Sequence, residues 1–98
     1  MDVEVMLKQV PLVEDFLKRM ANKNRLMILC SLLEGEMSVR ELNDCVPLSQ
    51  SALSQHLAVL RETGLVATRR DGQTIYYTLG SPDVELMLNT LHHMFCTS

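Results

Sequence analysis

The fold is decided by the stretch SQSALSQHLAVLRET, residues 49–63, which Gly64 follows. Its apolar residues Leu53, Leu57 and Leu60 recur at the spacing of one helical face, which predicts an amphipathic helix. Its polar residues are mainly Ser, Gln and His, whereas an ordinary solvent-facing helix carries Glu and Lys. Short uncharged side chains that donate and accept hydrogen bonds suit base edges in the DNA major groove. Composition alone leaves two interpretations, a DNA-reading face or a polar face without a partner.

The residues before this helix favour the first interpretation. Ser38 and Glu41 stand at the two positions of a capping box, which predicts a short helix from residue 39. That helix cannot continue through Pro47, because the proline ring disfavours helical geometry in the preceding residue. Two helices joined by a tight turn, with a polar second helix, form a helix-turn-helix.

The residues after Gly64 have the pattern of a β-hairpin. Two extended segments, 65–70 and 73–79, flank Asp71-Gly72, a dipeptide suited to a two-residue type I′ turn. A helix-turn-helix followed by a hairpin is a winged helix. We therefore expect a mainly α fold with a small β-hairpin.

Three more helices are expected around this unit. The first covers residues 3–20, with either a kink near residue 10 or a main body beginning at Pro11. The second runs from Asn22, its N-cap, to about Glu34 and ends at Gly35. The last begins at Ser81-Pro82. Because the first and last helices both carry surplus apolar stripes, we expect a homodimer through them, which would bind an inverted repeat with recognition helices roughly 34 Å apart.

Length and charge set further limits. The 98 residues are enough for a single domain, 1–98. The net charge of −3 disfavours DNA binding if taken globally, but residues 45–80 carry a net charge of +1. No apolar run approaches the roughly 18 residues needed to span a bilayer, so we expect a cytoplasmic protein.

We assign the DNA contacts to one set of polar and cationic residues: Ser49, Gln50, Ser51, Ser54, Gln55, His56, Arg61, Arg69, Arg70, Gln73 and Thr74.

The whole chain resembles the ArsR/SmtB-type winged-helix regulators. The similarity lies in ANKNRL at residues 21–26, LSQSALSQHL at 48–57 and GQTIYY at 72–77. It implies a transcription regulator without a cofactor that activates toxin or virulence genes by relieving silencing. No metal is expected, since Ser38 and Arg40 occupy the positions of the metal-binding cysteines and only scattered Asp83, Glu85, His92 and His93 remain in the last helix. A metal-responsive repressor and a protein-interaction module remain as alternatives.

Three cysteines, Cys30, Cys45 and Cys96, admit two interpretations. In a reducing cytoplasm each would be a small buried packing residue. The resemblance instead implies that Cys30 and Cys96 match the pair that links on oxidation in the redox- and sulfide-responsive branch, and we favour this switch for them. His92 and Cys96 share a helix face but make no complete metal site. No glycine-rich phosphate loop or nucleophile turn indicates an enzyme.

Overall fold

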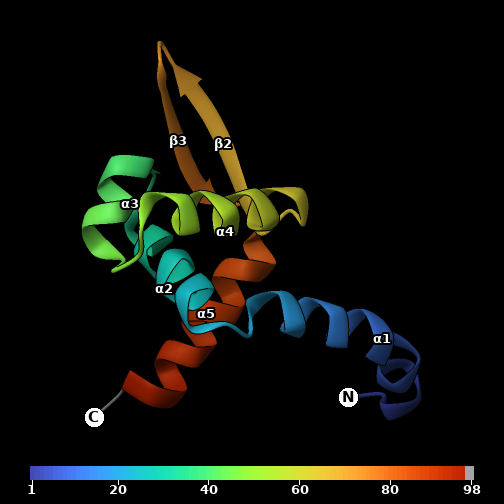
Figure 1. The fold of residues 1–98 in the computed structure, drawn as a ribbon. Helices are drawn as coiled ribbons and strands as arrows, with labels where there is room; N and C mark the ends of the chain where they lie inside the picture. The colour runs from blue at the N-terminus through green and yellow to red at the C-terminus, as the bar shows by residue number, and fades with distance from the viewer. Residues whose placement is uncertain (97–98) are drawn as a thin grey trace.

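The structure, a computed structural model, describes residues 1–96. A hairpin projects from a compact group of helices, and α1 extends away from that group at the other end of the molecule (Figure 1). The elements are α1 (Val3–Met20), α2 (Lys23–Ser31), the 3-10 helix η1 (Leu32–Glu34), β1 (Met37–Ser38), α3 (Val39–Cys45), α4 (Gln50–Glu62), β2 (Val66–Asp71), β3 (Thr74–Leu79) and α5 (Pro82–Cys96). The predicted mainly α winged helix is confirmed.

The predicted helix starts agree closely with the structure. In the capping box of α3, the Glu41 amide donates to Ser38 Oγ at 3.2 Å and the Ser38 amide donates to Glu41 Oε1 at 3.0 Å. The Asn22 side chain caps α2, but the α-helix ends at Ser31 and continues only as η1. The alternative in which the main body of α1 begins at Pro11 is wrong, because Pro11 lies inside the helix.

The sheet departs from the prediction in two respects. A third strand, β1, pairs with β3, so the antiparallel order is β1-β3-β2. The turn is Gly72-Gln73, since Asp71 already pairs with Thr74. Gly72 has a φ of 62°, while Gln73 has none of the positive φ that a type I′ turn requires. Glycine at the first central position fits a type II′ turn instead.

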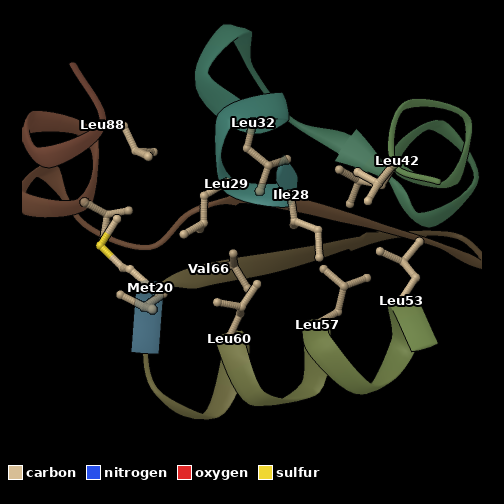
Figure 2. Close-up of a cluster of buried hydrophobic side chains, with 13 residues drawn as sticks. Met20, Ile28, Leu29, Leu32, Leu42, Leu53, Leu57, Leu60, Val66 and Leu88 are labelled. Atoms are coloured by element: carbon tan, nitrogen blue, oxygen red, sulfur yellow. The ribbon is translucent and has the colours of Figure 1, made fainter. Parts of the chain in front are cut away.

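The core lies between α4, α2 and the base of the hairpin. Leu53, Leu57 and Leu60 of α4 point toward Ile28 and Leu29 of α2 (Figure 2), and all five are at most 1% exposed. The terminal helices contribute less to this core. Of the 18 residues of α1 only Met20 is buried, and α5 contributes Val84 and Leu88.

Candidate nucleic-acid interface

The turn of the helix-turn-helix is fixed at both ends by side chains. Ser49 caps α4, its hydroxyl accepting the Ala52 amide at 3.2 Å. Asn43 in α3 donates to the Leu48 carbonyl at 2.9 Å across the turn. Since Val46 is fully buried beside these groups, the start of α4 is anchored to α3. This rigidity keeps the first residues of α4 in one orientation, as a base-reading helix requires.

The exposed face of α4 carries most of the predicted base-reading residues. Gln50, Ser51, Ser54 and Gln55 are exposed, with Arg61 near the other end of the helix. At 100° per residue, Ser51 and Gln55 point away from the buried leucines. Within residues 1–96, Gln50 and Gln55 make no side-chain hydrogen bond, so their amides are available to a partner. Ser49 lies at the same end, but its hydroxyl already accepts the cap bond.

His56 does not share this open face. It is half-buried, and Arg25 Nε of α2 donates to its Nδ1 at 3.3 Å. Arg25 is itself held by the carbonyl of Arg19, 3.4 Å from its Nη1. In the structure this side chain helps to join α4 to α2, and the base-reading role of His56 stays a prediction. The sequence offered no signal for this contact, because its partner lies 31 residues away.

Arg69 is also engaged within the chain. Its Nε lies 2.6 Å from Glu36 Oε2, and its Nη2 donates to the other oxygen of that carboxylate. Its guanidinium carbon stands 4.6 Å from the centroid of the Tyr76 ring. The hydrogen bonds from Arg69 hold the pKa of Glu36 below its usual value. The structure thus gives Arg69 a partner within the chain, while its predicted phosphate contact stays a prediction. Glu36 is a residue that sequence analysis missed.

The other wing residues remain open. Arg70, Gln73 and Thr74 are exposed around the hairpin turn. No hydrogen bond or ion pair engages the Arg70 side chain within the described part of the chain. Asp71 is the one carboxylate beside them on β2. The tip of the wing therefore offers a free guanidinium and two hydrogen-bonding side chains.

The cysteines differ from the packing interpretation, since Cys30, Cys45 and Cys96 are all exposed and free. Cys30 and Cys45 line one open groove of about 460 Å³, together with Glu34 and Glu36. Partial burial raises the pKa of the Cys30 thiol, and the charge of Cys96 raises it further.

Within residues 1–96, no three His, Cys, Asp or Glu side chains gather where they could hold a metal ion. None of the described helices combines the length and apolar character needed to cross a membrane.

A helix-turn-helix with an open polar second helix, joined to a hairpin wing, defines a winged-helix DNA-binding protein (Figure 1). The family model for "Bacterial regulatory protein, arsR family" matches residues 22–68. The chain belongs to this family, and it is a DNA-binding transcriptional regulator rather than an enzyme. The predicted resemblance is confirmed.

Named relatives agree with this assignment. The chain is 51% identical to the transcriptional activator HlyU of Vibrio cholerae over 98% of its own length and 89% of that protein. It is 43% identical to a biofilm growth-associated repressor of Xylella fastidiosa, over 96% of this chain and 82% of the relative. The crystal structure of the repressor BigR from Xylella fastidiosa superposes with a TM-score of 0.92 at 41% identity, covering 100% of both chains. Reduced HlyU from Vibrio cholerae gives a TM-score of 0.87 at 51% identity, covering 96% and 99%.

Proposed function

We propose that the chain binds an inverted repeat in double-stranded DNA as a homodimer joined through α1 and α5. The observation that carries this proposal is the large number of apolar side chains that these two helices expose. They are Val3, Val5, Met6, Leu7, Val10, Leu12 and Leu17 of α1, and Leu86, Met94 and Phe95 of α5. Removing one such side chain from water contributes roughly 1.5–3 kcal/mol. A second copy of the same helices would supply the missing apolar surface.

A groove between the two helices supports this choice. It is lined by Leu12, Val13 and Phe16 of α1 and by Leu86 and Met87 of α5. Because α1 lies away from the hairpin (Figure 1), a two-fold axis there would leave the hairpins of both copies uncovered. Two identical recognition helices related by a two-fold axis match two identical DNA half-sites.

We assign the DNA contacts to two groups. Gln50, Ser51, Ser54 and Gln55 read base edges, with Ser49 beside them at the start of α4. Arg61, Arg70, Gln73 and Thr74 contact phosphates and the flanking groove. Glutamine is suited to a bidentate contact with adenine, and serine accepts or donates to several bases. His56 and Arg69 are left out because Arg25 and Glu36 already hold them.

We further propose an activator. The relative of 51% identity carries the name transcriptional activator, whereas the relative of 43% identity is named a repressor. Activation of toxin or virulence genes by relief of silencing, as the family resemblance implies, stays a prediction.

Cys30 and Cys96 are proposed to make this binding redox-sensitive. Both thiols are exposed, and the charge of Cys96 acts on Cys30. Peroxide would convert one thiol to a sulfenic acid and release water. The second thiol would then displace a second water and close the disulfide, so that two electrons pass to the peroxide. The bond would tie the end of α5 to α2 and shift the spacing of the recognition helices, so that the linked form binds DNA less tightly.

The raised pKa of Cys30 limits how fast this reaction runs. Because the pKa of Cys30 is raised, a smaller fraction of its thiol is ionised at neutral pH than in an ordinary cysteine. The thiolate is the form that reacts with peroxide, so the reaction is slower. Modification of Cys30 should therefore accelerate as the pH rises through the alkaline range. The pH dependence of Cys30 modification can also be measured with a persulfide donor in place of peroxide.

The experiment combines DNA selection with oxidation. An operator is first selected from a random duplex pool, and its affinity for the wild type is then titrated with and without hydrogen peroxide. We expect an inverted repeat, weaker binding after peroxide, and peroxide resistance in Cys30→Ser. Cys45→Ser, which removes another exposed thiol, is the matched control and should respond like the wild type. Full affinity of the oxidised wild type, with an intact disulfide seen by mass spectrometry, would overturn the switch but not the DNA binding.

A further inference from the structure

Arg40 in the first turn of α3 lies between the two surfaces assigned to DNA. It lines one groove together with Gln73 and Thr74 of the hairpin. It also lines a second groove together with Asn43 of α3 and Gln50 at the start of α4. Its side chain is exposed. Arg40 therefore borders both the wing and the start of the recognition helix.

Nothing within residues 1–96 engages this charge. No hydrogen bond or ion pair joins Arg40 to another described side chain. The adjacent Glu41 carboxylate accepts the Ser38 amide at 3.0 Å instead. Asp44, one turn further on, lines the same groove as Arg40 without pairing with it. The cation remains free despite two neighbouring carboxylates.

The stability of α3 does not explain a cation at this position. The first turn of a helix is the positive end of its dipole, so an arginine there opposes the dipole instead of complementing it. The capping box already satisfies the amide groups at this end of the helix. The helix itself therefore does not account for an arginine at this position.

The geometry points to a DNA phosphate as that partner. In a helix-turn-helix the first helix crosses the sugar-phosphate backbone while the second enters the major groove. We infer that Arg40 anchors the backbone strand that passes between α4 and the wing. This inference rests on the DNA binding described above, and it names a phosphate contact beyond those assigned to Arg61 and Arg70.

Arg69 provides the matched comparison within the same interface. Both residues are arginines on the hairpin side of the molecule, and removal of either changes the net charge equally. Arg69 is held by the Glu36 carboxylate and the Tyr76 ring, whereas Arg40 is free. A phosphate contact by Arg40 therefore predicts different salt dependences for two substitutions that are alike in charge.

The test measures duplex affinity against salt for the wild type, Arg40→Gln, Arg40→Lys and Arg69→Gln. Each lost phosphate contact lowers the slope of log affinity against log salt by about 0.9, so Arg40→Gln should lose roughly that much per subunit. Between 50 and 200 mM salt, the loss of DNA affinity should therefore be roughly threefold to fourfold smaller in the variant than in the wild type for each contact removed. The loss should be equal for the selected operator and a random duplex, because phosphates carry no sequence information. Arg40→Lys should keep the slope, and Arg69→Gln should leave it unchanged.

The outcomes separate this inference from the proposed function. A wild type that binds no duplex would overturn the DNA binding itself. A wild type that binds, with an unchanged slope in Arg40→Gln, would overturn the role of Arg40. An equal slope loss in Arg69→Gln would also overturn it, since general charge would then suffice. Thermal unfolding of each variant checks that the affinity change does not come from a loss of folded protein.

Discussion

The helix-turn-helix with its wing and the pair of terminal helices solve the burial of apolar side chains in opposite ways. In the first region, Leu53, Leu57 and Leu60 of α4 are at most 1% exposed, and the outer face of the helix is polar. In the second, Leu12 of α1 is 69% exposed and Leu86 of α5 is 65% exposed. The first region completes its core within one chain, and the second does not.

This difference teaches what each region presents to a partner. The uncharged polar face of α4 gains little from a protein surface but offers hydrogen bonds to base edges. The apolar faces of α1 and α5 offer DNA nothing and suit another apolar surface. We therefore expect the chain to present α4 and the hairpin to DNA, and α1 and α5 to a second copy. The hairpin and α1 lie at opposite ends of the molecule (Figure 1).

The largest effect is expected at the proposed dimer interface of α1 and α5. Leu86→Glu places a charge on the exposed apolar face of α5, and it should convert a dimer to a monomer and abolish tight operator binding. Because Leu86 is exposed within the single chain, the monomer should keep its helical content. Sedimentation at micromolar concentration and circular dichroism measure the two properties. A wild type that sediments as a monomer would contradict the proposed dimer through α1 and α5.

The second prediction separates the two kinds of burial. Leu57→Ala should lower the free energy of unfolding by about 2–5 kcal/mol, because it leaves a cavity in the core of the single chain. Leu12→Ala should destabilise the dimer but have little effect on the diluted monomer. Urea denaturation at several protein concentrations distinguishes the two. If the cost of Leu12→Ala did not shrink on dilution, α1 would be packed within its own chain.

The third prediction concerns the DNA surface. Gln55→Ala should cost about 1–3 kcal/mol at one base position of the operator and relax specificity there, because a bidentate contact is lost. Titration against single-base operator variants measures the change. Equal losses of affinity for operator and random DNA would show that Gln55 does not read a base.

The smallest effect is expected from the ion pair between Glu36 and Arg69 of β2. The pKa of Glu36 is lowered by Arg69 in the folded chain, so the pair stabilises the fold above the ordinary glutamate pKa of about 4.3. That contribution is lost as the pH falls through the lowered pKa. Glu36→Gln should therefore reduce stability slightly at pH 7, and the difference from the wild type should vanish in acid. Glu34→Gln removes an exposed carboxylate two residues away and serves as the control in urea titrations. A pH-independent difference would contradict the pairing.

Local sequence signals predicted the fold well. The capping box of Ser38 and Glu41, the cap at Asn22 and the leucine spacing of α4 depend on residues within a turn or two of one another. The position of the hairpin turn was predicted one residue too early, because two neighbouring dipeptides could each form it. Asp71-Gly72 and Gly72-Gln73 both supply glycine to a two-residue turn, and cross-strand pairing selected the second. Strand β1 was missed because its two residues gain stability only by pairing with β3.

The amino-acid sequence by itself determined which helices form, which face of α4 is polar, and that the terminal helices carry more apolar surface than one core needs. Only the tertiary structure decided which polar residues are free. Arg25 reaches His56 across 31 residues and Glu36 reaches Arg69 across 33, whereas Arg40 and Arg70 find no partner among the described residues. The physical reason is that helix and turn signals act over a few residues. A hydrogen bond or an ion pair instead needs two complementary groups within about 4 Å, and the fold can bring these together from any distance in the sequence.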